Sequence, residues 1–134
     1  MTELKGGCLC GKIRYTVQKA AGPAVICHCT HCQKASGSAF SVNLPVASGD
    51  IAFEGEMAAY PDTAESGKRV TRRFCPTCGS SLGSEAEIFP GVFILKAGSL
   101  DSHETIAPKL QLWTRSAQPW VRLGDELKSY EKGR

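Results

Sequence analysis

Hydrophobic and polar residues alternate along several short stretches of the chain, which glycine, proline and asparagine residues separate. Ile13, Tyr15 and Val17 alternate with charged or polar neighbours. This pattern predicts a half-buried strand, because successive side chains of a strand face opposite sides of the sheet. Residues 40–46 repeat the pattern, and Pro45 within them predicts an edge strand or the end of a strand.

Other stretches favour strands as well, and helical periodicity is scarce. Residues 68–74 mix charged and β-branched side chains, which predicts a solvent-facing strand, and residues 92–97 and 110–113 predict two apolar strands. Only residues 125–130 favour a helix, because two apolar side chains lie three residues apart opposite a charged side. The predicted fold class is therefore mainly β, made of short strands with a short C-terminal helix.

Length and composition indicate one globular domain over residues 1–134, without internal repeats or an obvious linker. Lys and Arg number 16 against 13 Asp and Glu, an excess too small for a typical nucleic-acid binder, although it could favour a small acidic ligand. The polar N-terminus does not resemble a signal peptide, and the apolar runs are too short to span a bilayer. We therefore expect a cytoplasmic protein without a membrane partner.

Seven cysteines are the most informative feature, and their odd number in a reducing compartment favours metal binding over disulfides. Cys8 and Cys10 lie two apart between glycines, so both thiols can reach one ion from an extended chain. Cys75 and Cys78, followed by Gly79, have the spacing of a zinc knuckle. Two such pairs predict a closed four-cysteine site, the arrangement that structural zinc prefers.

The remaining cysteines, Cys27, Cys29 and Cys32, predict a second zinc site. Three protein ligands leave a fourth coordination position for water or substrate, which is typical of catalytic zinc. Zinc also keeps a coordinated thiol deprotonated, so such a site can present an incoming thiolate at neutral pH. We therefore expect two zinc ions per chain, one structural and one catalytic.

Two other ligand arrangements stay open at this point. His28 or His31 could supply a fourth ligand and close the middle site, and His31 is the better placed because His28 faces away from its cysteine neighbours on an extended chain. Alternatively, the middle cluster could borrow Cys8 or Cys10, which would leave the knuckle incomplete. His103 stands alone in a polar stretch, where we expect a surface residue.

Several motifs of the chain also occur together in one known family. These are Gly-Cys-Leu-Cys-Gly at residues 7–11, the cysteine cluster at 27–32, Ser-Gly-Ser-Ala-Phe at 36–40 and Phe-Cys-Pro-Thr-Cys-Gly-Ser at 74–80. In them the chain resembles the glutathione-dependent formaldehyde-activating enzyme family, which shares a domain with the centromere protein V group. The resemblance extends through residues 97–101 and 118–120, and so covers nearly the whole chain.

The resemblance implies a β-tent-type fold of short antiparallel sheets pinned by zinc. It implies the same ligand sets, with Cys27, Cys29 and Cys32 at the catalytic zinc. The implied activity is that of a carbon–sulfur lyase, with glutathione and formaldehyde giving S-hydroxymethylglutathione. One position departs from the family, because members often carry a histidine where this chain has Gln111.

The residues themselves favour zinc-assisted handling of a thiol adduct. Lys34, Arg72 and Arg73 lie two or three residues from a ligand cysteine and are candidates to hold a carboxylate of the thiol. The loop at residues 36–38 either lines the site or makes a turn. The rival hypotheses are a non-catalytic zinc module that recognises protein or nucleic acid, and a purely structural two-zinc fold.

Overall fold

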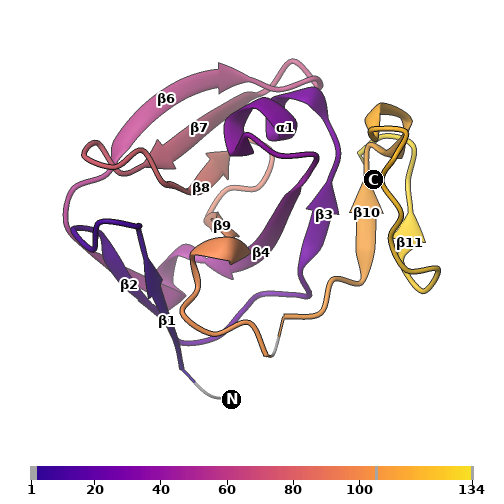
Figure 1. Cartoon of the computed structure of the whole chain (residues 1–134). Coiled ribbons are helices and arrows are strands. Elements are labelled where there is room, and N and C mark those ends of the chain that lie inside the picture. The colour runs from indigo at the N-terminus through magenta and orange to yellow at the C-terminus, as the bar shows by residue number, and fades with distance from the viewer. Residues whose placement is uncertain (1–2, 105, 134) are drawn as a thin grey trace.

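The first two strands and the fifth form a small antiparallel sheet beside a larger one (Figure 1). The computed structural model describes residues 3–104 and 106–133. The small sheet has the order β1–β2–β5, with β1 at Leu4–Gly7, β2 at Arg14–Val17 and β5 at Ile51–Glu54. Ile13, Tyr15 and Val17 are all buried, which confirms the half-buried strand predicted from their alternation.

The large sheet of the described residues has the strand order β11–β10–β3–β4–β9–β8–β7–β6. Its strands are β3 (Val25–Cys27), β4 (Ser41–Ala47), β6 (Ala58–Thr63), β7 (Arg69–Phe74), β8 (Ser81–Ala86), β9 (Val92–Lys96), β10 (Leu110–Leu112) and β11 (Lys128–Ser129). Neighbouring strands are antiparallel, except that β10 runs parallel to both β3 and β11. The mainly β prediction is confirmed, with β4, β7, β9 and β10 at the predicted places.

The hydrophobic core lies between the small sheet and one face of the large sheet. Leu44 and Val46 of β4 and Leu95 of β9 are at most 4% exposed there. Phe53 of β5 joins the two layers, because its ring makes an edge contact with Tyr15 on one side and another, at 5.1 Å between ring centroids, with Phe93 of β9. Burial of these apolar faces holds the two sheets together.

The opposite face of the large sheet carries a row of polar side chains, which we call the polar face. Directly opposed residues of neighbouring strands share one face. The register therefore places three opposed pairs on the polar face: Cys27 and Ser41, Asn43 and Lys96, and Ser84 and Arg72. Asp62 shares this face, because it lies two residues along β6 from the residue opposite Arg72. Ser41, Asn43, Ser84 and Lys96 are all buried, so this face is covered.

The cover over the polar face includes helix α1, Thr30–Ser36, which lies across the upper part of Figure 1. Its N-cap is Cys29, whose Sγ accepts a hydrogen bond from the Cys32 N–H at 3.3 Å. The helix ends at Gly37, whose φ of 64° is the left-handed conformation that glycine adopts most easily. Sequence periodicity did not predict this helix, since seven residues show no extended apolar stripe. Within residues 3–104 and 106–133, three short 3-10 turns are the other helical structure, at Ser48–Asp50, Ala97–Ser99 and Thr114–Ser116.

The predicted helix at residues 125–130 is wrong. This segment contains a turn and β11, which pairs with β10 through hydrogen bonds from the Lys128 N–H to the Lys109 carbonyl and from the Tyr130 N–H to the Gln111 carbonyl. An isolated helix of six residues is unstable in water, whereas the free edge of β10 offers backbone partners at once. Edge pairing therefore overrides the weak helical periodicity.

Pro45 does not mark an edge strand, because β4 lies inside the large sheet between β3 and β9. Pro45 does lie beyond the part of β4 that pairs with β3, since that pairing ends at Asn43. The Pro45 carbonyl accepts from the Ala21 N–H instead. The strand at β7 is likewise flanked by β6 and β8, so most of its residues are half-buried rather than solvent-facing. Among the described residues no helix has the length and hydrophobicity that crossing a bilayer requires.

Candidate metal centres and an adjoining cleft

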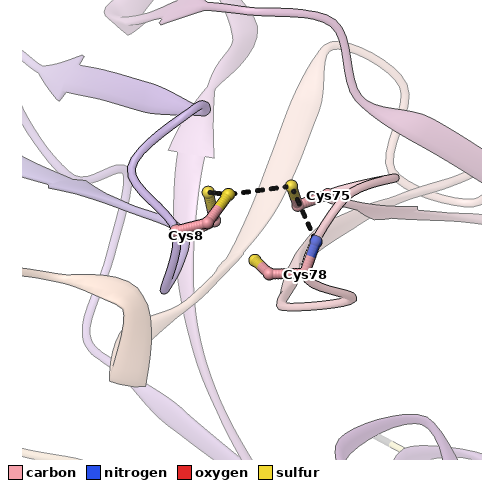
Figure 2. A group of neighbouring side chains, drawn as sticks. Cys8, Cys75 and Cys78 are labelled. Atoms are coloured by element: carbon pink, nitrogen blue, oxygen red, sulfur yellow. Dashed lines mark hydrogen bonds between the residues drawn. The ribbon is translucent and has the colours of Figure 1, made fainter.

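The four-cysteine group joins two hairpin loops that are distant in sequence (Figure 2). Cys8 and Cys10 lie in the loop between β1 and β2, and Cys75 and Cys78 lie in the loop between β7 and β8. The Sγ atoms of Cys8 and Cys10 are 3.6 Å apart, and those of Cys10 and Cys75 are 3.8 Å apart. Zinc–sulfur bonds of about 2.3 Å in a tetrahedron place sulfurs about 3.8 Å apart, so this donor set fits zinc.

Backbone amides also point at these sulfurs. The Ile13 N–H donates to Cys8 Sγ at 3.2 Å, and the N–H groups of Thr77 and Cys78 approach Cys75 Sγ at 3.4 and 3.5 Å. Donors of this kind stabilise thiolates, the form in which cysteine binds a metal. Gly79, with a φ of 79°, lets the loop turn back after Cys78.

The three-cysteine group is contained in one short segment on the polar face. Cys27 ends β3, Cys29 caps α1 and Cys32 lies in the first turn of α1. Their Sγ atoms all lie within 4.8 Å of one another, and Cys29 and Cys32 are buried. The structure thus brings together the same groups of four and three that the spacing predicts, and neither group borrows a cysteine from the other.

The electrostatics of this second group favour a bound cation. Hydrogen bonds from Cys27 and Cys29 lower the pKa of Cys32 below its usual range. Hydrogen bonds with Cys29 and Cys32 raise the pKa of Cys27 strongly, and burial raises it further. One thiolate is therefore stabilised by its neighbours, but three cannot form together without a positive charge among them. A divalent ion such as zinc supplies that charge, so the donor set fits it.

Neither neighbouring histidine lies within the three-cysteine group. His28 is 1% exposed and faces the other side of the large sheet, where its Nε2 lies 2.7 Å from Gln111 Oε1. His31 turns toward β6, and its Nδ1 lies 2.9 Å from Asp62 Oδ2. Both imidazoles therefore have other partners in this structure, while the third, His103, is exposed as expected.

A cleft of about 460 Å³ lies between α1 and the strands β6 and β7. Its lining includes Thr30 and His31, which fall between Cys29 and Cys32 in the sequence, and it includes all three candidate cations: Lys34, Arg72 and Arg73. Sequence spacing alone therefore identified three basic residues that line one cavity. This cleft gives a small acidic ligand a place against α1, the helix that carries Cys32.

Asp62, which sequence reasoning missed, organises one wall of this cleft. It accepts hydrogen bonds from His31 and from Arg72 Nε and Nη2, the last at 3.0 Å. Burial raises the pKa of Asp62, but the bonds from His31 and Arg72 outweigh it and lower the pKa below its ordinary value. Its place on β6 depends on strand pairing, so no local sequence signal marks it.

The two other candidate cations, Arg73 and Lys34, differ in whether an acidic side chain already neutralises their charge. Arg73 pairs with Glu85 at 2.7 Å, whereas Lys34 is exposed and forms no ion pair with any residue that the structure describes. Lys34 also borders a second hollow of about 430 Å³, with Gln33, Gly37 and Ser38. The loop at residues 36–38 therefore both ends α1 and lines a hollow beside it.

Comparisons with known proteins agree with this architecture. Residues 3–116 match the family described as glutathione-dependent formaldehyde-activating enzyme. A crystal structure of a Rhodobacter sphaeroides protein, a structural genomics target, is similar with a TM-score of 0.59. The two chains are 19% identical, and the match covers 78% of this chain and 91% of the other, so it supports the fold alone. No curated protein matches the sequence.

Proposed function

Because the chain belongs to the glutathione-dependent formaldehyde-activating enzyme family, we propose that it is a zinc-dependent carbon–sulfur lyase. In one direction the thiol of glutathione adds to formaldehyde. The sulfur–carbon bond forms, the carbonyl double bond becomes single, and the thiol proton ends on the oxygen, which gives S-hydroxymethylglutathione. In the other direction the carbon–sulfur bond is cleaved.

The cysteines divide into a structural and a catalytic set. Cys8, Cys10, Cys75 and Cys78 would hold the structural zinc, and Cys27, Cys29 and Cys32 the catalytic zinc. Bound there, zinc supplies Lewis acidity toward a carbonyl oxygen and favours the thiolate form of a thiol. The protein contributes a buried position for this chemistry, since Cys29 and Cys32 are both shielded from water.

The cleft between α1 and β7 would hold the rest of the thiol substrate. Glutathione carries two carboxylates, and the cleft offers Lys34 and, beside their acidic partners, Arg72 and Arg73. A carboxylate held at Lys34 would fix the orientation of the thiol, which is how binding of remote groups contributes to rate. The observation that carries the proposal is a three-cysteine group whose own segment, through Thr30 and His31, lines a cleft that also holds three cations.

Cobalt substitution provides a direct test. In protein loaded with cobalt in place of zinc, glutathione should increase the sulfur-to-cobalt charge-transfer absorption as a further thiolate joins the three-cysteine site. Cys29→Ser should reduce this response. Adduct formation from glutathione and formaldehyde should also exceed the uncatalysed rate. A spectrum that no small thiol changes would refute the proposal and favour the non-catalytic zinc module that binds protein or nucleic acid.

The role of Lys34 can be tested separately with two thiols. Lys34→Met should weaken glutathione binding by about two- to fivefold, the range of an exposed ion pair. Binding of 2-mercaptoethanol, which has no carboxylate, should stay unchanged. Lys19→Met, which removes an exposed lysine outside the cleft, is the matched control. Equal weakening of both thiols would show that Lys34 does not hold a carboxylate.

A further inference from the structure

A buried lysine lies beside the three-cysteine group. Lys96 ends β9 on the polar face, directly opposite Asn43 and next to the Ser41–Cys27 pair, and it is only 8% exposed. Lysine is rarely buried without a compensating charge or function. Arg72 is a cation on the same face, so the nearby groups that can balance Lys96 are the cysteine thiolates.

Two hydrogen bonds that point the same way connect Lys96 to Ser41, the neighbour of Cys27 on the adjoining strand. Its Nζ donates to Asn43 Oδ1 at 2.8 Å, and Asn43 Nδ2 donates to Ser41 Oγ at 2.9 Å. Ser41 lies directly opposite Cys27 on the same face, so these two hydrogen bonds lead from Lys96 to the residue beside the three-cysteine group. Both donors are directed toward the side of the face that carries the cysteines, an arrangement that suits negative charge there.

The pKa of Lys96 responds to the same neighbours. Burial lowers the pKa of Lys96 below its ordinary value and Arg72 adds to this, while Cys32, Cys27 and Cys29 offset part of the shift. Negative charge at the cysteines therefore favours the ammonium form. A zinc ion with three thiolates has a net charge of minus one, and a fourth thiolate makes it minus two.

We infer that Lys96 is the charge partner of the three-cysteine centre and allows it to accept a thiolate substrate. This inference rests on the proposed function and assigns Lys96 as a positioning residue, which acts through Asn43, Ser41 and the electrostatic field. Without its charge, the second negative charge brought by the substrate would be poorly compensated in a buried site. Lys96 thus supports the binding of thiols as anions, whatever their other groups.

The test compares an anionic ligand with a neutral one in cobalt-loaded protein. Lys96→Met should weaken binding of both glutathione and 2-mercaptoethanol by about tenfold to hundredfold, as expected for removal of a nearby unit charge. Binding of imidazole, which adds no charge to the metal, should change less than twofold. Lys19→Met serves again as the control for loss of an ordinary surface lysine.

The outcomes separate the inference from the proposed function. If the wild-type protein binds thiols and Lys96→Met binds them equally well, Lys96 is not the charge partner, and the proposed function stands. If thiol and imidazole binding weaken together, the role of Lys96 is structural and the inference fails. A wild-type protein that binds no thiol overturns the proposed function itself. Should Lys96→Met not fold, Lys96→Gln keeps a donor toward Asn43 without the charge, and the same comparison applies.

Discussion

The two cysteine groups should contribute very differently to stability, and Cys10 and Cys29 offer a sharp comparison. Cys10 is exposed, whereas Cys29 is buried. Loss of packing alone would therefore make Cys29→Ser the more damaging change. The ligand sets predict the reverse, because Cys10 helps to connect two hairpins 65 residues apart, while Cys29 belongs to a group contained in residues 27–32.

The expected magnitudes follow from the length of chain that each metal would close. A cross-link over 65 residues removes enough entropy from the unfolded chain to stabilise the fold by about 4 kcal/mol, against about 2 kcal/mol for a loop of five or six residues. Typical domains are stable by about 5–15 kcal/mol, so the first loss is large. Serine at position 29 also keeps a good N-cap for α1, which limits the cost there.

Urea unfolding of the zinc-loaded variants, followed by circular dichroism, would measure these costs. With a slope of about 2 kcal/mol per molar urea, Cys10→Ser should lower the midpoint by up to about 2 M, the value for complete loss of the metal, and Cys29→Ser by about 1 M or less. Free zinc must be held equal in all samples, since a bound metal stabilises by mass action. A cost for Cys29→Ser equal to or above that for Cys10→Ser would refute the reasoning and make the middle site structural too.

Two further predictions concern the whole protein and its core. Elemental analysis of protein purified without chelator should give about two zinc ions per chain, and a reproducible value near one that added zinc does not raise would exclude the second site. Burial raises the pKa of Tyr15 to about 12. Because the folded state then keeps this proton longer than the unfolded state, the contribution of Tyr15 is complete below pH 10 and is lost as the pH rises toward 12, by about 1.4 kcal/mol at pH 11. An ultraviolet titration should show one late tyrosine, which Tyr15→Phe removes.

Local patterns predicted the strands and the cysteine groups because each depends on a few neighbouring residues. The alternation at Ile13, Tyr15 and Val17 needs only the period of a strand, and the pair Cys75 and Cys78 needs only one tight turn. The three candidate cations were found for the same reason, since each lies close to a cysteine in sequence. The resemblance to a family added the expected chemistry.

Features that depend on strand register could not be predicted in this way. Lys96 lies on the same face as the three-cysteine group because β9 pairs with β4, and Asp62 reaches His31 because β6 lies at the far edge of the same sheet. The predicted C-terminal helix failed for a related reason, because the parallel pairing of β11 with β10 supplies hydrogen bonds that only the assembled sheet provides. Nothing in the six residues themselves indicates that partner.

The long separation between the two halves of the four-cysteine group has a consequence during synthesis. Ribosomes add about 5–20 residues per second, so Cys10 emerges several seconds before Cys75, which lies 65 residues later. Cys27, Cys29 and Cys32 emerge almost together and can capture an ion at once. We therefore expect the metal of the three-cysteine group to bind first. Until the second cysteine pair is synthesised, Cys8 and Cys10 remain a metal-free dithiol, with which oxidants or toxic soft metals can react.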